Sequence, residues 1–311
     1  MKIVFLGTPK FAVPTLEMLI KHHEVLLVVT QPDKPIGRKK VMTASPVKEV
    51  ALKYGIEVFQ PNKLRKDYQK ILDLKPDLLI TAAYGQMLPK GLIDPIVSMN
   101  VHGSLLPKYR GGAPIQYALF NGDEQTGVTI MYMAYQMDSG DMIKQASIDI
   151  LEDDNCETLT KKLSSLGAYL LENVLDDYAA NIKERMVQDE SQVTFAYTIK
   201  YEDEKIDFTM SAKDIVNKIK GLYPEPGVHF DYLGQSIKIY QAKKSDIIVK
   251  NAEPGQIILT KKHLLIQAKD GVVDILELQI PGKKRMKAPV YLNGQTLFNE
   301  GDIIKEGENN E

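Results

Sequence analysis

The first 180 residues alternate short apolar runs with amphipathic stretches, and this alternation restricts the possible folds more than any other feature. Residues 2–6 and 25–29 are apolar and rich in β-branched side chains, and the segment between them has apolar residues at helical spacing. The alternation continues with Glu57-Val58-Phe59 and with an apolar run at 78–83, with a helical pattern at 64–74 between them. Strands that alternate with helices form parallel sheets covered on both faces. The sequence therefore predicts an α/β domain with a Rossmann-like, doubly wound, mostly parallel sheet.

The later part of this region continues the same domain. Residues 98–102 read as another strand, and residues 127–134 and 142–150 read as a pair resembling a hairpin. A long amphipathic helix is predicted over 155–181, because its leucines recur on one stripe. We expect the first domain to close there and to span residues 1–183.

After residue 183 the composition becomes polar and charged without sustained periodicity, which favours a linker over 184–205. A helix is predicted at 211–221, and Gly- and Pro-containing turns then separate a series of short apolar runs. This spacing is typical of a small β-barrel, compatible with an OB-like barrel over 206–311. The predicted strands lie near 228–240, 245–249, 255–260, 263–268 and 272–279.

Cysteine usage and the amino terminus indicate the compartment. Cys156 is the single cysteine, so the sequence predicts no intramolecular disulfide and no zinc ribbon. The apolar run at the amino terminus is too short for a signal peptide or a membrane span. We therefore expect a cytoplasmic protein that is not bound to membranes.

Charge is unevenly distributed along the chain. The formal net charge is −2, which argues against a protein that is basic over its whole surface. Residues 206–300, however, contain 14 Lys/Arg and 10 Asp/Glu, whereas the tail 301–311 is acidic. The second domain can therefore present basic surface to a nucleic acid.

The segment that begins Asn100-Val101-His102-Gly103 is the strongest candidate for chemistry. Residues two apart in a strand project to the same face, so the amide of Asn100 and the imidazole of His102 can reach one point. Open α/β sheets bind ligands at the carboxyl ends of their strands. The alternative interpretation is that His102 is a packed histidine at a strand terminus and Asn100 a turn former.

A histidine that moves protons needs a group to orient it, and a turn between two predicted strands offers carboxylates. Asp138 and Asp141 both belong to this turn. The alternative is that both residues only form the turn, as Asp-Ser-Gly often does. Spacing alone does not decide which of them lies near His102.

Together these motifs resemble the methionyl-tRNA formyltransferase family, within the wider class of folate-dependent formyltransferases. The resemblance covers essentially the whole chain, including the linker and the second domain. The motifs that carry it are Phe5-Leu6-Gly7-Thr8-Pro9 with Phe11-Ala12, Gln31-Pro32-Asp33, Ser45-Pro46-Val47-Lys48, Asn100-Val101-His102-Gly103-Ser104-Leu105-Leu106-Pro107 and Met137-Asp138-Ser139-Gly140.

The resemblance implies transfer of a formyl group from 10-formyltetrahydrofolate to the amino group of methionyl-initiator-tRNA. It implies that Asn100, His102 and Asp138 are catalytic, with Asn100 and protonated His102 able to donate hydrogen bonds to an oxygen that becomes negative. The reaction as written needs no metal, and the sequence has no clustered His/Cys ligands. The folate contacts expected are Ser104, Leu105, Leu106, Pro107, Tyr84, Gly85, Gln86, Met87 and Leu88.

The resemblance also identifies the tRNA as a partner. Four cations lie within residues 34–40, on a loop that resembles the tRNA-contacting loop of the family, and cations of this kind bind phosphates. A solvated surface loop is the alternative interpretation. Lys200 departs from the linker pattern of the family, because Ile199 precedes it and Tyr201 follows it. The expected tRNA contacts are Lys34, Arg38, Lys39, Lys40, Lys200, Lys283, Lys284 and Arg285.

Three other functions compete with this interpretation. A dehydrogenase is disfavoured because residues 7–12 do not match G-x-G-x-x-G. A non-catalytic RNA-binding protein would leave Asn100 and His102 without a role. A sugar-amine or nucleotide-amine formyltransferase would share the catalytic residues, and the second domain argues against it. We expect the chain to act as a monomer.

Overall fold

The computed structural model describes residues 1–37, 40–181, 185–294 and 297–304. The chain divides into two compact units that are not contiguous in sequence. The sequence-based boundaries at 183 and 206 stay a prediction. Unit 1 comprises Met1–Pro114, Gln125–Ile150 and Leu159–Thr198, and unit 2 comprises Ile115–Glu124, Leu151–Thr158 and Ile199–Glu311.

Unit 1 is built on a sheet whose described strands have the order β5-β2-β1-β6-β7-β8-β9. The pairs from β5 through β7 are parallel, whereas β8 and β9 are antiparallel to their neighbours. This mostly parallel sheet confirms the predicted fold class. The strands are β1 (Lys2–Gly7), β2 (Glu24–Val29), β5 (Val58–Phe59), β6 (Leu78–Ala82), β7 (Ser98–His102), β8 (Gln125–Tyr132) and β9 (Met142–Asp149).

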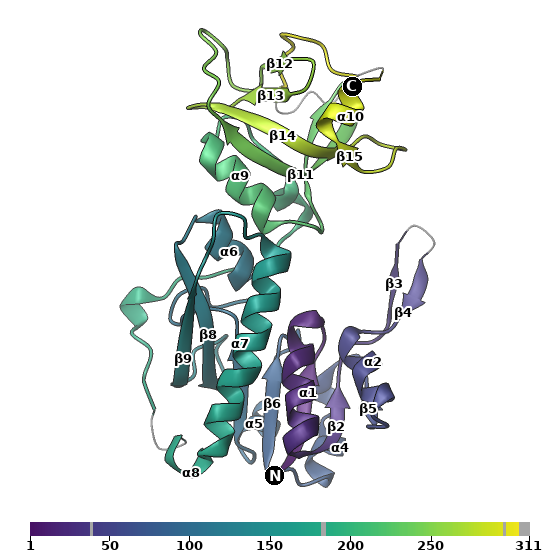
Figure 1. Cartoon of the computed structure of the whole chain (residues 1–311). Helices are drawn as coiled ribbons and strands as arrows, with labels where there is room; N and C mark the ends of the chain where they lie inside the picture. Colours follow the sequence, from purple (N-terminus) through teal and green to yellow (C-terminus); the bar gives the residue numbers. More distant parts are fainter. Residues whose placement is uncertain (38–39, 182–184, 295–296, 305–311) are drawn as a thin grey trace. The chain divides into compact units, whose positions relative to one another are not determined.

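Helices cover both faces of this sheet, which explains the uninterrupted apolar runs of its central strands. On one face, Val4 and Leu6 of β1 pack in a cluster with Leu64, Ile71 and Leu92. These three side chains come from α3 (Leu64–Asp67), α4 (Gln69–Asp73) and α5 (Lys90–Ile93). Figure 1 shows α1 (Val13–His22) and α7 (Cys156–Asp176) beside each other, and an ion pair of 3.0 Å joins their residues His22 and Glu172.

Helix α7 packs closely against the strand that carries the candidate catalytic residues. A Cβ added to Gly167 of α7 would lie 2.7 Å from Val101 Cγ1 of β7. Val101 lies between Asn100 and His102, and its side chain is buried. Because Gly167 has no side chain, helix α7 can pack closely against Val101 of β7 and stabilise the position of that strand.

Several elements differ from the sequence prediction. The helix expected at 64–74 is divided at Tyr68 into α3 and α4, and α8 (Tyr178–Asn181) follows α7 as a separate turn. A hairpin that was not predicted, β3 (Lys34–Ile36) with β4 (Val41–Thr43), projects from the rest of the unit (Figure 1). Among the described residues, unit 1 also contains α2 (Pro46–Lys53), which Ser45 caps by accepting a hydrogen bond from the Lys48 N–H.

Unit 2 contains the antiparallel sheet predicted for the carboxyl-terminal region, in the order β10-β11-β14-β13-β12 with β15 paired to β14. A strand predicted at 245–249 is wrong, because β11 ends at Ser245. The elements are α6 (Pro114–Phe120, from Ile115 onward), α9 (Ala212–Gly221), β10 (Val228–Tyr232), β11 (Gln235–Ser245), β12 (Ile257–Leu259), β13 (Leu264–Gln267), β14 (Val272–Gln279), β15 (Met286–Lys287) and α10 (Ala288–Leu292).

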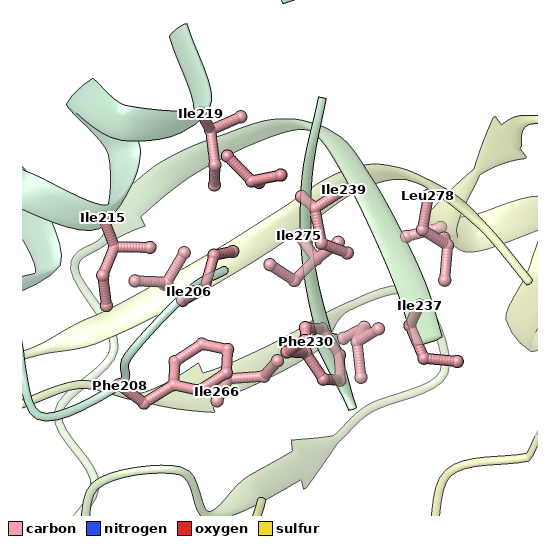
Figure 2. Packing of buried hydrophobic residues seen from close by; sticks show 14 of the residues in the cluster. Ile206, Phe208, Ile215, Ile219, Phe230, Ile237, Ile239, Ile266, Ile275 and Leu278 are labelled. Carbon is pink, nitrogen blue, oxygen red and sulfur yellow. The ribbon is translucent and has the colours of Figure 1, made fainter. Parts of the chain in front are cut away.

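The core of unit 2 forms where α9 packs on this sheet. Ile215 and Ile219 of α9 lie four residues apart on one face of the helix and are buried against Ile239 and Ile275 (Figure 2). Phe230 is also buried there, with its ring 5.5 Å from Phe208 in an edge-to-face arrangement.

His229 is a titratable side chain buried within unit 2. Its ring stacks on Tyr201 at 4.9 Å, and its Nδ1 has no hydrogen-bond partner among the described residues. Burial lowers the pKa of His229 below its ordinary value, with smaller contributions from neighbours such as Asp231, which raises it, and Lys238, which lowers it.

This lowered pKa predicts acid sensitivity. Below about pH 6.5 the unfolded chain binds a proton at His229 that the folded chain does not. The free energy of unfolding therefore decreases as the pH is lowered from about 6.5 to the pKa of His229 in the folded chain. We expect His229→Phe to reduce this loss while it keeps the ring contact with Tyr201. Urea unfolding of both proteins between about pH 8 and about pH 5 measures this loss of stability. If the variant and the wild type show the same pH dependence, His229 is not the cause.

Candidate active site

Asn100 lies at the carboxyl edge of the sheet, where β6 and β7 are parallel neighbours. Thr81 of β6 is the register partner of Asn100 in β7. The Thr81 hydroxyl donates a 2.7 Å hydrogen bond to Oδ1 of Asn100. This bond fixes the orientation of the amide, and Nδ2 of Asn100 has no partner among the described residues. The amide therefore presents a free N–H donor at the sheet edge.

His102, at the end of β7, is 5% exposed and makes two directed contacts. Its Nε2 lies 2.9 Å from the backbone oxygen of Tyr109. A carbonyl oxygen only accepts, so Nε2 carries the hydrogen in this contact. On the other side of the ring, Nδ1 lies 3.7 Å from Oδ2 of Asp138. The imidazole is thus held between a backbone carbonyl and a carboxylate.

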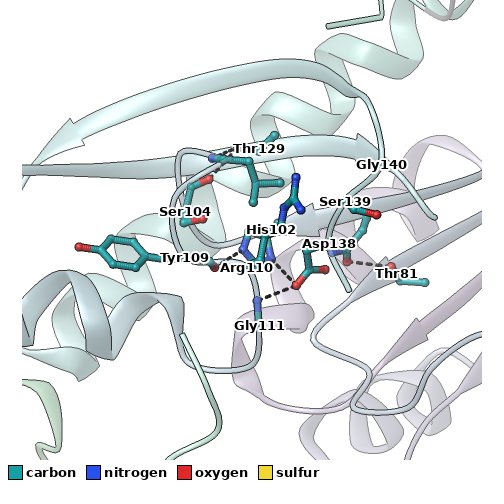
Figure 3. Close-up of polar contacts among 12 residues, drawn as sticks. Thr81, His102, Ser104, Tyr109, Arg110, Gly111, Thr129, Asp138, Ser139 and Gly140 are labelled. Carbon is teal, nitrogen blue, oxygen red and sulfur yellow. Dashed lines mark hydrogen bonds and ion pairs between the residues drawn. The ribbon is translucent and has the colours of Figure 1, made fainter. Parts of the chain in front are cut away.

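The structure places Asp138, rather than Asp141, next to His102. Figure 3 shows His102, Asp138 and Gly111 directed toward one another, and the Gly111 N–H donates a 2.8 Å hydrogen bond to Oδ2 of Asp138. Asp141 is instead 3.9 Å from Arg185. Spacing along the sequence left this choice open, because both carboxylates belong to the same turn.

Residues 104–107 are held down by a side chain from the neighbouring strand. The Thr129 hydroxyl donates to the backbone oxygen of Ser104 at 2.7 Å and accepts from the Leu106 N–H at 3.1 Å. The Ser104 hydroxyl donates to the backbone oxygen of Lys108, and the Leu106 side chain is buried. Leu105 and Pro107 are half-buried. Sequence reasoning missed Thr129, which lies opposite His102 in β8.

The loop after β6, residues 83–88, alternates buried and exposed side chains. Tyr84 and Leu88 belong to the core of unit 1, whereas Gly85 and Met87 are exposed and Gln86 is half-buried. Burial raises the pKa of Tyr84 to about 12. In the described part of the chain, the backbone groups of residues 85–88 have no hydrogen-bond partner. They remain available to a ligand at the edge of the sheet.

Side chains after β1 and β2 hold this loop in place. The Thr8 hydroxyl and the Gln31 amide both donate to the backbone oxygen of Tyr84, at 2.9 and 3.1 Å. Gln86 uses its own amide to accept from the Leu64 N–H and to donate to Pro61 O. Hydrogen bonds therefore connect the loops that follow β1, β2 and β6, which are adjacent parallel strands.

Two predicted tRNA contacts of unit 1, Lys34 and Lys40, lie on the β3–β4 hairpin. Lys34 and Lys40 are exposed, whereas Arg38 and Lys39 lie outside the described residues. The base of the hairpin is anchored by Asp33, which accepts from Lys48 at 2.7 Å and from Gln60 at 2.7 Å. The bond from Lys48, followed by that from Gln60, lowers the pKa of Asp33.

The other predicted tRNA contacts lie in unit 2. Lys200, Lys283 and Lys284 are exposed. Arg285 is half-buried, pairs with Glu277 and lies 4.2 Å from the centre of the Tyr240 ring. The bond to Glu277 raises the pKa of Arg285 further above its already high value. Arg285 therefore has a structural role within the unit, through its pair with Glu277 and its contact with Tyr240.

The described residues allow two further observations. They contain no group of three or more His, Cys, Asp or Glu side chains placed to hold a metal ion. None of the helices formed by these residues is long and apolar enough to cross a membrane.

Comparison with known families agrees with the fold. The family described as formyl transferase matches residues 1–175, and the family described as formyl transferase, C-terminal domain, matches residues 198–296. The fold and the site thus define the formyl transferase class. The curated methionyl-tRNA formyltransferase of Staphylococcus epidermidis is 48% identical over 301 residues, which are 94% of this chain and 96% of the relative. That of Ligilactobacillus salivarius is 49% identical over 300 residues, 94% of each chain. The chain belongs to the methionyl-tRNA formyltransferase family.

Solved structures share the fold at lower identity. The N-formyltransferase from Helicobacter canadensis, in complex with folinic acid and dTDP-3-aminofucose, matches with a TM-score of 0.67 and 21% identity, over 88% of this chain and 98% of its own. HypX from Aquifex aeolicus in complex with tetrahydrofolic acid matches with a TM-score of 0.64 and 17% identity, over 94% of this chain and 47% of that chain. At these identities the likeness shows a common fold only.

The bond between Thr81 and Asn100 gives a testable prediction. Thr81→Val removes the hydroxyl that orients the amide, so we expect the kcat of formyl transfer to fall about 3- to 12-fold, the equivalent of one hydrogen bond. Thr15→Val is the matched control, because Thr15 is equally buried and its hydroxyl has no partner among the described residues. Equal kcat values for the two variants would contradict the role of Thr81.

Proposed function

We propose that this chain transfers the formyl group of 10-formyltetrahydrofolate to the free amino group of methionyl-initiator-tRNA, giving formylmethionyl-tRNA for translation initiation. The observation that carries the proposal is the free amide N–H of Asn100 two residues before a histidine that faces a carboxylate. The high identity to curated methionyl-tRNA formyltransferases supports the choice of acceptor.

Asn100 supplies the hydrogen bond that the reaction needs most. When an amine attacks a formyl carbon, the formyl oxygen gains negative charge, and a donor already in position stabilises it without reorganisation. Nδ2 of Asn100 is such a donor, because the bond from Thr81 to Oδ1 keeps the amide from rotating. Loss of one donor of this kind typically costs about 100- to 1,000-fold in rate.

His102 removes the proton that the attacking amine must lose. As the bond from the formyl carbon to N10 of the folate breaks, this proton passes to N10 of the departing tetrahydrofolate. Nε2 is occupied by Tyr109 O at 2.9 Å, so Nδ1 is the ring nitrogen left to accept a proton, directly or through a water molecule. Asp138 lies 3.7 Å from Nδ1, where its negative charge stabilises the imidazolium that forms and keeps the ring oriented.

The edge of the sheet fits a reduced folate. The co-substrate supplies an activated formyl group and a flat pterin ring rich in donors and acceptors. The unpartnered backbone groups of residues 85–88 match such a ring, and the segment 104–107, held by Thr129, forms the second wall of the proposed site. The chain thus offers polar backbone and partly exposed apolar side chains, which is the combination that binding sites for small molecules use.

Basic side chains on both units bind the phosphates of the tRNA in this proposal. Lys34 and Lys40 lie on the projecting hairpin together with the exposed apolar side chains of Val41 and Met42, and Lys200, Lys283 and Lys284 extend the basic surface of unit 2. The enzyme works in the cytoplasm, where charged initiator tRNA and reduced folate are both present, and it acts as a monomer.

A direct assay tests the proposed function. Purified protein, 10-formyltetrahydrofolate labelled on the formyl group and methionylated initiator tRNA should yield labelled aminoacyl-tRNA. Uncharged initiator tRNA and methionylated elongator tRNA are the controls, and both should stay unlabelled or react poorly. Transfer to an amino sugar nucleotide, with none to the tRNA, would overturn the choice of acceptor.

Asp138→Asn tests the role of the carboxylate. The variant keeps the size of the side chain but removes the charge next to His102, so we expect kcat to fall about 100-fold. Folate binding, followed by fluorescence titration, should stay unchanged. Asp141→Asn, in the same turn, is the matched control and should keep kcat, because Asp141 faces Arg185 instead of His102. If both variants turn over alike, the assignment is wrong.

Charge reversal on the hairpin tests the tRNA contact. We expect the double variant Lys34→Glu, Lys40→Glu to raise the KM for tRNA and to make tRNA binding less dependent on salt, because fewer counterions are released. Lys21→Glu, on the exposed surface of α1, is the control. An unchanged KM and salt dependence would exclude the hairpin, and weakened folate binding would point to misfolding instead.

A further inference from the structure

The turn that carries Asp138 has a backbone conformation that needs support. Asp138 has a φ of +49°, in the left-handed region that side chains other than glycine rarely adopt. The bond from the Gly111 N–H holds the Asp138 carboxylate but not the backbone of the turn. The His102–Asp138 distance of 3.7 Å therefore depends on whatever fixes the backbone of residues 138–140.

Gln188 provides this support from a distant part of the chain. Its Nε2 donates two hydrogen bonds of 2.8 Å, one to the backbone oxygen of Asp138 and one to that of Gly140. Both hydrogens of the amide are thus used on the two carbonyls that flank the turn. Gln188 is 4% exposed, so water does not easily replace either bond.

Arg110 in turn holds Gln188. The Arg110 Nε–H donates to Oε1 of Gln188 at 3.0 Å, which fixes the amide with its N–H groups toward the turn. Arg110 is only 3% exposed, and its remaining guanidinium nitrogens donate to both carboxylate oxygens of Glu190 at 2.8 and 3.3 Å. A buried arginine is tolerated when it is paired in this bidentate way.

The backbone beside Arg110 leads back to the histidine. Tyr109 O accepts the bond from His102 Nε2, and the Gly111 N–H donates to Asp138. The segment is pinned by the linker, because the Arg110 N–H donates to Thr194 O and the Ala196 N–H donates to Arg110 O. A side chain at Gly111 would collide with Ala196 O, and Gly111 has a φ of +128°, so glycine is required there.

We propose that Gln188, held by Arg110, is a positioning residue for formyl transfer that keeps the Asp138 carboxylate at its working distance from His102. The contacts form a closed ring from His102 through Tyr109 and Arg110 to Gln188, and from there through Asp138 back to His102. Figure 3 shows the side of this ring that contains His102, Tyr109 and Asp138. Gln188 itself touches no reacting atom. The proposal rests on the proposed function, because it concerns the same catalytic pair.

Gln188→Glu tests the proposal. The carboxylate still accepts from Arg110 but can no longer donate to the two carbonyls of the turn, so the linker stays attached while the turn is released. We expect kcat to fall about 10- to 100-fold, as small misplacements of catalytic groups do, with KM values for both substrates within about two-fold. Gln192→Glu is the matched control, the same change four residues later at an exposed site, and it should keep kcat.

A double-mutant cycle distinguishes positioning from general stabilisation. If Gln188 acts through Asp138, adding Gln188→Glu to Asp138→Asn should lower kcat by less than about two-fold more, because the carboxylate it positions is already neutralised. A merely structural residue would lower kcat by the same factor in both backgrounds. Should Gln188→Glu unfold, Gln188→Met, of similar size and without a donor, replaces it in the cycle.

The outcomes separate the two proposals. A wild-type enzyme that does not formylate methionyl-tRNA refutes the proposed function, whatever the variants do. An active wild-type enzyme together with a fully active, folded Gln188→Glu variant refutes the role of Gln188 alone. The role of Gln188 is also refuted if Gln188→Glu lowers kcat by the same factor in the wild-type enzyme and in the Asp138→Asn variant. It is supported if Gln188→Glu lowers kcat only in the enzyme that retains Asp138.

Discussion

The parallel pairing of β6 with β7 is the constraint on which the site depends. It places the Thr81 hydroxyl beside Asn100, so that a backbone register determines where an amide N–H points. The other neighbour of β7, β8, is antiparallel, and it brings Thr129 opposite His102. Strand β7 thus lies where the sheet changes from parallel to antiparallel pairing. Thr81 on one side bonds to Asn100, and Thr129 on the other side bonds to the backbone of residues 104 and 106.

Much of this architecture follows from patterns within a few residues. The apolar runs of β1 and β6 indicated strands buried on both faces, and the spacing of two residues between Asn100 and His102 indicated a common direction. The β3–β4 hairpin was missed, because each strand has only three residues, too few for a visible alternation, and β3 also contains Lys34 and Pro35.

The remaining site residues have no local signature, because tertiary contacts bring them in. Thr81 and Gln188 lie 19 and 50 residues from Asn100 and Asp138, their partners. The choice between Asp138 and Asp141 also depends on which carboxylate meets Gly111. Gln188 belongs to a segment that its polar composition marked as a linker, yet it is buried, because hydrogen bonds rather than apolar side chains hold the segment down.

The segments Ile115–Glu124 and Leu151–Thr158 belong to unit 2 although they lie within the sequence of unit 1. A Cβ at Gly221 would collide with the Phe120 ring, and Lys220 Nζ donates to Glu152 O at 2.6 Å, so α9 packs on both segments. On the ribosome, Phe120 emerges roughly a hundred residues before α9, a delay on the order of ten seconds at bacterial elongation rates. During that interval the apolar residues of α6 lack a packing partner that has not yet been synthesised, so binding of a chaperone at this stage would protect the chain.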